Sequence, residues 1–192
     1  MNKEEIEQLQ EVVRKVVSSQ MQPREKQSST TVNTNNAQQQ KSIAIGADHG
    51  GFSMKAALIP YLEELGFQVI DCGTYNTDSV DYPDFAYAVA KHVSEGSAWR
   101  GIMIDGAGIG SCMTANKVKG VRAAMCYDYA TASNSREHNA ANMLTMGSGL
   151  IGLNQAKLIV KTWLTTEYAG GRHQNRIDKI MQIEQLYFKD GK

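Results

Sequence analysis

Residues 102–111 read IMIDGAGIGS, an apolar run that ends in Asp105 and continues into three alternating glycines. Such a run is typical of a buried strand in a parallel sheet, and a helical pattern follows it over Cys112–Lys117. Ligands of parallel α/β proteins bind at such junctions, where a strand ends and a helix begins. Converging N–H groups of the loop would hold an anion, and Asp105 would supply a general base. A tight glycine turn capped by Asp105 is the alternative interpretation.

The composition limits the class of protein. The chain has 192 residues and zero formal net charge, which gives no electrostatic sign of a nucleic-acid or membrane partner. The three cysteines, Cys72, Cys112 and Cys126, lack the spacing of a metal site and indicate a reduced, cytoplasmic protein. No apolar run approaches the roughly 20 residues that span a bilayer, and the N-terminus lacks the apolar block of a signal peptide. We expect no metal and no cofactor.

The chain divides into three parts by composition. Residues 1–20 carry apolar side chains at helical spacing and predict an amphipathic helix. Residues 21–41 are mostly Gln, Ser, Thr and Asn, which predicts a flexible linker. Residues 42–192 form the third part and predict a globular domain. The apolar stripe of the first part consists of Ile6, Leu9, Val13, Val16 and Val17.

Alternating strand and helix patterns in the third part predict an α/β fold, with a parallel sheet covered on both faces. The predicted strands are Ile43–Ala47, Gln68–Asp71, Gly101–Ile104, Arg122–Cys126 and Met143–Met146. The predicted helices are Met54–Leu65, Asp84–Ser94, Ser111–Val118, Tyr129–Asn139, Asn154–Thr165 and Ile177–Phe188.

Two more motifs place polar groups at element ends. Asp48 and His49 follow the first predicted strand and precede two glycines, which favours a ligand site; a helix cap by Asp48 is the alternative. Asp81-Tyr82-Pro83 follows a polar loop and predicts a helix start at Pro83, where Tyr82 could line a pocket.

The last two motifs lie nearer the C-terminus. His138 ends a predicted helix, and an imidazole both gives and takes protons near neutral pH; a helix cap is the alternative. Arg172 and Arg176 are four residues apart after two glycines and would make a phosphate fork on one helical face, with a solvated basic turn as the alternative.

Other common site types are not supported. The spacing of Gly106, Gly108 and Gly110 does not match the G-x-G-x-x-G dinucleotide fingerprint. The sequence also lacks a G-x-x-x-x-G-K-[ST] loop, a His-rich metal motif and a G-x-S-x-G elbow.

Taken together, these motifs resemble the ribose-5-phosphate isomerase B family, which also contains the galactose-6-phosphate isomerase subunits. They occur in family order over residues 43–183. The resemblance implies a five-stranded parallel sheet in a three-layer α/β/α sandwich. It also implies a homodimer with active sites at the subunit interface, with any larger assembly left open, and metal-free interconversion of aldose and ketose sugar phosphates.

The resemblance implies a role for each matching position. His138 would open the sugar ring, with Asp48 as its polar partner. The glycine loop would bind the enediolate through its N–H groups. The phosphate would be held by His49, Arg172 and Arg176, with the arginines reaching across the dimer. The implied substrate-binding residues are His49, Tyr82, Gly106, Gly108, Gly110, Ser111, Asn139, Arg172 and Arg176.

The sequence departs from the family at the position that takes the C2 proton. Many members have a cysteine where this chain has Asp105, with Thr or Ser at Ala107, and a second lineage has Glu at Ser111. An Asp at this position resembles a galactose-6-phosphate isomerase subunit. Asp105 is the base in our first hypothesis, since partial burial raises the basicity of a carboxylate. In the second, proton transfer is lost and the protein binds a sugar phosphate or has a structural role.

A nucleotide- or phosphate-sensing domain is a further alternative, because a fold alone does not fix function. The N-terminal part suggests a location: an amphipathic helix on a polar linker resembles the encapsulation peptides of bacterial microcompartment cargo enzymes. Residues 1–20 would bind the microcompartment shell or other cargo, and the protein would then lie inside a microcompartment in the cytoplasm. A dimerising helix, a helix docked on its own domain and a disordered tail are the other interpretations.

Overall fold

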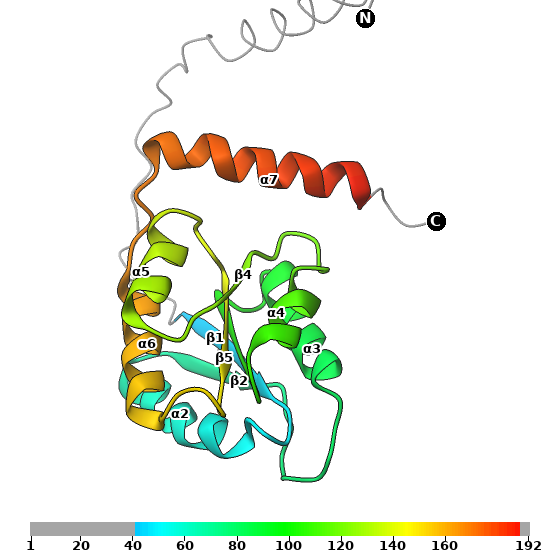
Figure 1. Cartoon of the computed structure of the whole chain (residues 1–192), viewed down its shortest axis with the longest axis vertical. Helices are drawn as coiled ribbons and strands as arrows, with labels where there is room; N and C mark the ends of the chain where they lie inside the picture. The colour runs from blue at the N-terminus through cyan, green and yellow to red at the C-terminus, as the bar shows by residue number, and fades with distance from the viewer. Residues whose placement is uncertain (1–40, 189–192) are drawn as a thin grey trace, which may run out of the picture. The chain divides into compact units, whose positions relative to one another are not determined.

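The structure is a computed structural model that describes residues 41–188 (Figure 1). The predicted helix over residues 1–20 lies outside the described residues, as does the predicted linker apart from Lys41. The ammonium of Lys41 lies 4.1 Å from the centre of the Trp99 ring, and its carbonyl accepts a hydrogen bond from Gln68 N–H at 3.1 Å. Lys41 is therefore tied to the edge of the sheet.

One five-stranded sheet forms the centre of the domain, and all of its strands are parallel. The strand order is β2-β1-β3-β5-β4. The strands are β1 (Ser42–Ala47), β2 (Gln68–Asp71), β3 (Arg100–Asp105), β4 (Ala123–Met125) and β5 (Met143–Gly147). The predicted parallel α/β sheet is confirmed, with a difference of no more than one residue at any strand end.

Six α-helices connect or follow these strands in the described part of the chain. They are α2 (Phe52–Glu64), α3 (Tyr82–Ser94), α4 (Ile109–Ala115), α5 (Tyr129–Glu137), α6 (Leu153–Thr165) and α7 (Gln174–Tyr187), and the short 3₁₀ turn η1 (Gly171–His173) precedes α7. Pro83 lies in the first turn of α3, where its missing N–H leaves no helical hydrogen bond unmade.

Two helix ends differ from the prediction by three residues, and the others differ by two or fewer. Helix α4 ends before the predicted Val118 because the Asn116 side chain turns to β4: its Nδ2 donates to Ala123 O at 3.0 Å, and its Oδ1 accepts from Ala123 N–H at 2.9 Å. Helix α7 starts before the predicted Ile177, because η1 leads directly into it.

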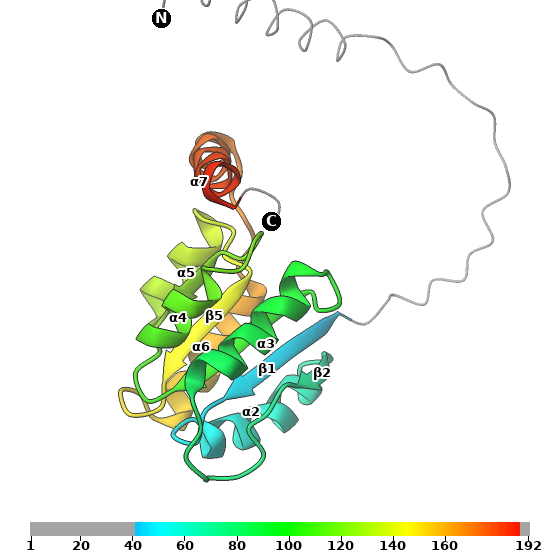
Figure 2. The ribbon, with the colours of Figure 1, turned by 90° about the vertical axis from the view of Figure 1, so that its right-hand side faces the viewer.

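Helices cover both faces of the sheet and give three layers, as Figure 2 shows. On one face, Leu58 of α2, Ala132 of α5 and Trp163 of α6 belong to one buried apolar cluster. On the other face, Val89 of α3 and Ala115 of α4 belong to a second cluster. The predicted α/β/α sandwich is therefore confirmed.

This arrangement of strands and helices indicates where a ligand would bind. Strands β1 and β3 are neighbours, yet α2 and α4, which follow them, cover opposite faces. The carboxyl ends of such a strand pair form a topological switch point, where open α/β sheets bind ligands. Asp48 directly follows β1, and Asp105 is the last residue of β3.

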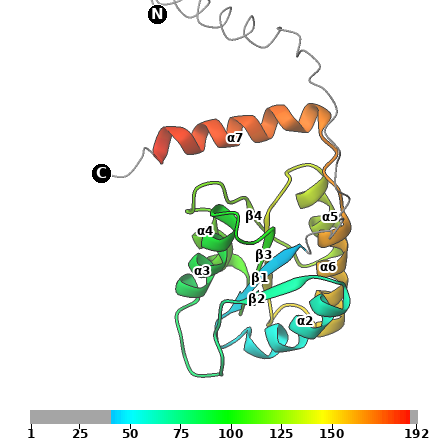
Figure 3. The same cartoon turned by 180° about the vertical axis from the view of Figure 1, so that it is seen from behind.

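Helix α7 lies apart from both layers, across one end of the sheet (Figures 1 and 3). Within α7, Ile177 is the buried residue, at 5% exposure. Four apolar side chains farther along are exposed by 46% to 83%: Ile180, Ile183, Leu186 and Tyr187. Among residues 41–188, no helix is both long enough and apolar enough to cross a membrane.

Candidate active site

Asp105 lies at the centre of the glycine loop and is 4% exposed. Its Oδ1 accepts hydrogen bonds from the N–H groups of Ala107, at 2.8 Å, and of Gly108. Its Oδ2 accepts from Ser111, through N–H at 3.2 Å and through Oγ at 2.5 Å. The carboxylate therefore holds the loop that follows it through these hydrogen bonds. Asp105 caps the glycine turn, as one interpretation of the sequence predicts, and it also places a carboxylate at the candidate site, as the other predicts.

The loop also presents backbone N–H groups that Asp105 does not use. Those of Gly106, Ile109 and Gly110 have no acceptor among the hydrogen bonds of residues 41–188. Gly108 has φ of +80°, a left-handed conformation that disfavours other residues. This conformation turns the chain so that α4 begins beside the carboxylate. Unpaired N–H groups at such a turn are donors for an oxyanion.

Asp48, His49 and Tyr82 surround this loop at the carboxyl edge of the sheet. Asp48 is 7% exposed, and its Oδ1 accepts from Gly51 N–H at 2.9 Å. His49 Nδ1 lies 3.2 Å from Val80 N, which ties the exposed imidazole to the segment before α3. Tyr82 packs so closely against the loop that a Cβ added to Gly110 would come within 2.6 Å of its Oη. We call Asp48, His49, Tyr82, Asp105 and residues 106–111 the carboxyl-edge cluster.

The remaining predicted side chains line a separate cavity of about 360 Å³, which we call the α5–α7 pocket. Its lining residues are Asn134, His138, Asn139, Arg172, His173 and Arg176. Arg172 belongs to η1 and Arg176 to α7, and no carboxylate in residues 41–188 pairs with either guanidinium. Two unpaired guanidinium groups on one polar cavity are suited to a phosphate.

Two residues of the α5–α7 pocket had no role in the sequence analysis, Asn134 and His173. His173 stacks on His138, with ring centroids 4.2 Å apart and an angle of 5° between the planes. Partial burial and the nearby His138, Arg172 and Arg176 lower the pKa of His173. The sequence contained a signal for each of these two residues. His173 is next to Arg172, and Asn134 is one helical turn before His138.

The carboxyl-edge cluster and the α5–α7 pocket lie at opposite ends of the strands. Helix α5 starts after the carboxyl end of β4 and runs back, so His138 comes shortly before β5 begins. Arg122, which precedes β4, donates from Nε to Asn139 O at 3.3 Å and holds this segment at the amino edge. Asp48 and Asp105 stand at the carboxyl edge. One copy of the chain therefore does not bring His138 together with Asp105.

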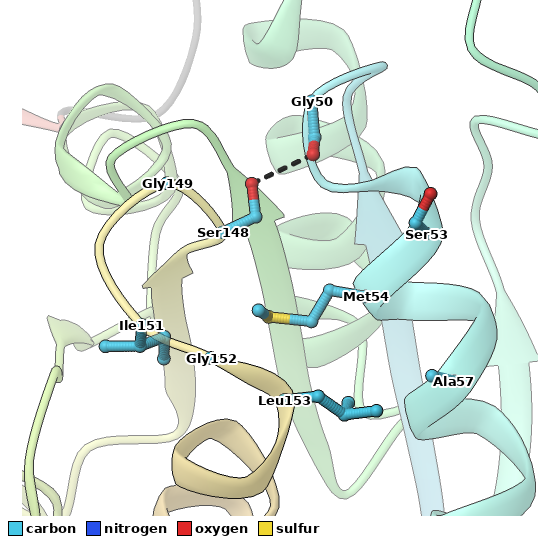
Figure 4. Close-up of a pocket in the computed structure, with 9 residues that line it drawn as sticks. All are labelled: Gly50, Ser53, Met54, Ala57, Ser148, Gly149, Ile151, Gly152 and Leu153. Carbon is cyan, nitrogen blue, oxygen red and sulfur yellow. Dashed lines mark hydrogen bonds between the residues drawn. The ribbon is translucent and has the colours of Figure 1, made fainter.

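A larger cavity of about 580 Å³ lies between α2 and the segment that leads from β5 into α6 (Figure 4). Met54, Ile151 and Leu153 supply its apolar wall, and Ser148 Oγ donates to Gly50 O at 2.9 Å on its polar side. None of the site residues predicted from the sequence lines this cavity.

All three cysteine thiols have a raised pKa. Burial raises the pKa of Cys72 and of Cys126 to about 11, and burial also raises the pKa of Cys112. Cys112 Sγ donates to Ala123 O at 3.5 Å, on the β4 side of α4. Within residues 41–188, no three His, Cys, Asp or Glu side chains are grouped so that they could hold a metal ion.

Known proteins resemble this chain over nearly all of the described domain. The profile of a family described as Ribose/Galactose Isomerase matches residues 43–180. Ribose-5-phosphate isomerase B of Escherichia coli (strain K12) is 46% identical over 145 residues, which are 76% of this chain and 97% of that protein.

Solved structures of related proteins share the fold. Ribose-5-phosphate isomerase B of Clostridium thermocellum has a TM-score of 0.75 at 49% identity, and the match covers 76% of this chain and 99% of that one. The Mycoplasma genitalium protein of the same name, solved with bound ribulose 5-phosphate, has a TM-score of 0.73 at 42% identity, over 75% of this chain and 96% of that one.

Proposed function

This chain belongs to the ribose/galactose isomerase family and is a sugar-phosphate aldose–ketose isomerase, and we propose that it interconverts ribose 5-phosphate and ribulose 5-phosphate. The observation that carries the proposal is the glycine loop. A buried carboxylate, Asp105, stands beside the unpaired N–H groups of Gly106, Ile109 and Gly110. Isomerisation through an enediolate needs a base and donors for the developing oxyanion, and the loop offers both.

We assign the proton transfer to Asp105. The carboxylate takes the proton from C2 of the open-chain aldose, electrons move into the C1–C2 bond, and the enediolate oxygen accepts hydrogen bonds from the loop. A proton then passes from the C2 hydroxyl to the C1 oxygen, and return of the proton from Asp105 to C1 gives the ketose. Rotation of the Ser111 hydroxyl, which needs no movement of the backbone, frees one lone pair of Asp105 Oδ2 for this step, while Ser111 N–H still donates to the same oxygen.

We assign ring opening and substrate binding to the other predicted residues. His138 opens the ring with Asp48 as its polar partner, Tyr82 and Asn139 contact sugar hydroxyls, and Ser111 supports the loop. The phosphate is held by His49, Arg172 and Arg176.

We propose that two copies of the chain build each active site. Asp105 at the carboxyl edge and His138 at the amino edge need a second copy to meet. The exposed apolar row of α7 supports such an assembly, because apolar side chains on one helix face favour a partner. Ile180 and Ile183 of this row follow Arg176 along α7, so docking of α7 would carry the arginine to the partner's carboxyl-edge cluster.

A turnover assay on the purified full-length protein tests the proposed substrate. Ribose 5-phosphate, ribulose 5-phosphate, allose 6-phosphate and galactose 6-phosphate are offered separately, with the Asp105→Asn variant beside the wild type. We expect turnover of the two pentose phosphates and its loss in the variant.

Other outcomes would change the assignment. Turnover of only a hexose phosphate would make the chain a hexose-phosphate isomerase, in line with the Asp at position 105. Absence of turnover on all four, in a folded protein, would contradict the proposal and leave a sugar-phosphate-binding protein or an enzyme that needs a second subunit type.

We further propose that residues 1–20 direct the enzyme into a bacterial microcompartment as cargo, with residues 21–41 as the linker to the isomerase domain over residues 42–192. The family profile begins at residue 43, so the amphipathic pattern precedes the part of the chain shared with the isomerases. An apolar stripe on a short helix is suited to a helical groove of a shell protein or of other cargo.

A further inference from the structure

His138 is the histidine of the α5–α7 pocket that the proposed function uses, and two neighbours hold its ring. Asn134 contacts one edge of the imidazole and His173 covers one face. Both contacts lie outside the buried core, since Asn134 is exposed and His173 is half-buried.

The contact with Asn134 fixes which ring nitrogen is available. Asn134 Nδ2 lies 2.8 Å from His138 Nδ1, and the two residues are one turn apart on α5. An amide nitrogen only donates, so Nδ1 is the acceptor and the neutral ring carries its hydrogen on Nε2. Nε2 lies 3.9 Å from the Glu137 carboxylate, which is beyond hydrogen-bond distance. Nε2–H therefore remains the donor that His138 can offer to a ligand.

The contact with His173 fixes the plane of the ring. Centroids 4.2 Å apart and planes 5° apart describe a parallel stack, which prevents the imidazole from swinging about its Cβ–Cγ bond. The charged groups near the two rings are Arg172 and Arg176, which line the same pocket, and Glu137.

We propose that Asn134 and His173 are positioning residues that hold His138 in a single tautomer and orientation, with Nε2–H directed to the sugar. This inference rests on the proposed function, because it assumes that His138 acts on the substrate. A neutral imidazole held as a hydrogen-bond donor polarises an oxygen whose bond to carbon is breaking, as ring opening requires. Loss of either contact should slow turnover more than it weakens binding, since misplacement of a reacting group by about 1 Å can cost about 100-fold in rate.

The first arm of the test measures the tautomer and needs no activity. Imidazole nitrogen–proton correlation spectra are recorded on the wild type, Asn134→Leu and the control Ser133→Ala, with His138→Gln to assign the signal among the four histidines. We expect one neutral tautomer, with hydrogen on Nε2, in the wild type and in Ser133→Ala. Asn134→Leu should give a mixture of both tautomers. An unchanged His138 signal in Asn134→Leu would overturn the proposal.

The second arm measures kcat and KM with the sugar phosphate that the wild type turns over. Asn134→Leu and His173→Ala should lower kcat about 10- to 100-fold with KM changed less than threefold. His173→Phe retains a flat ring and should recover much of the loss, while the exposed neighbour variant Asn175→Ala should behave as wild type. Unchanged kcat in both Asn134→Leu and His173→Ala would contradict the positioning role.

The two arms separate the possible failures. If the wild type turns over none of the sugar phosphates, the proposed function fails, yet the spectra still decide whether Asn134 fixes the tautomer. If turnover is present and only the spectra fail to change, the positioning role fails alone.

Discussion

Ser111 donates two hydrogen bonds to the same oxygen of Asp105, from its backbone N–H at 3.2 Å and from its hydroxyl at 2.5 Å. Both residues are buried, at 0% and 4% exposure. The pair joins the end of β3 to the first turns of α4, so the candidate base and the loop that would bind the enediolate form one hydrogen-bonded unit.

Replacement of this carboxylate by an amide should remove turnover. Asp105→Asn keeps an oxygen for the N–H groups of Ala107 and Gly108 but cannot accept a proton as a carboxylate does. Loss of a general base lowers rates about 10²- to 10⁴-fold, and we expect kcat to fall by that amount. The measurement is steady-state turnover of the preferred substrate.

The amide also places an NH₂ group opposite Ser111 N–H, which leaves a buried donor unmatched and should cost about 1–3 kcal/mol of stability. The thermal unfolding of the variant and of the wild type must therefore be measured together with their turnover. Asp105→Cys, which installs the cysteine found in many family members, is the rescue variant. Full activity in a folded Asp105→Asn protein would show that another group is the base.

Tyr82 and Gly110 give a second prediction. A Cβ on Gly110 would lie 2.6 Å from Tyr82 Oη, so Gly110→Ala forces the half-exposed phenol ring away from the loop. We expect kcat/KM to fall at least about tenfold, through loss of the sugar contact, with little loss of stability. Gly152→Ala is the matched control, because its added methyl meets nothing within 4 Å and its φ is −80°. Equal kinetics for the two variants would remove Tyr82 from the site.

The separation of Asp105 from His138 shows what sequence reasoning could and could not provide. Apolar runs and glycines predicted the strands, the parallel sheet and the loop after β3, because burial and turn geometry act locally. The sequence also placed His138 at a helix end. Its position at the amino edge depends on the direction of α5, which only the assembled sheet fixes.

Other features depended on contacts that have no periodic signal. The hydrogen bonds of Ser111 to Asp105 require the left-handed turn at Gly108, and the stack of His173 on His138 requires η1 to fold back on the end of α5. The residue types alone suggested a polar site at these positions. That Ser111 pairs with Asp105, and His173 with His138, is seen only in the three-dimensional structure.

Mixed dimers give a third prediction. Asp105→Asn and His138→Ala chains should each be nearly inactive alone. In a mixed dimer, one of the two sites receives an intact Asp105 from one chain and an intact His138 from the other. Once the mixed dimers are purified, one intact site of two should give about half of the wild-type activity per dimer.

The control for this experiment mixes two chains that both carry Asp105→Asn. Differently tagged chains are co-expressed and the doubly tagged species is purified before the assay. If the mixed dimer is no more active than its parents, each site is completed within a single chain and the proposal of shared sites is wrong.

The thiols give a fourth prediction, with a defined pH dependence. A pKa of about 11 means that Cys72 and Cys126 are protonated at pH 8, with about one thiolate in a thousand, and become reactive as the pH rises toward that value. The raised pKa of Cys112 acts in the same direction. Iodoacetamide at pH 8 should therefore leave turnover unchanged, as expected if a carboxylate is the base. Loss of turnover in proportion to alkylation of Cys112, followed by mass spectrometry, would give that thiol a role in the reaction.

The N-terminal part gives the last prediction. Deletion of residues 1–41 should leave kcat and KM unchanged, because every residue assigned to the site lies in residues 48–176. The same segment fused to a fluorescent protein should concentrate in the microcompartments of cells that form shells. A fusion in which Leu9 and Val13 are both changed to Asp interrupts the apolar stripe and should remain diffuse. A wild-type fusion that also remains diffuse would exclude targeting. Loss of activity on deletion would instead indicate that the helix packs on the isomerase domain or joins its copies.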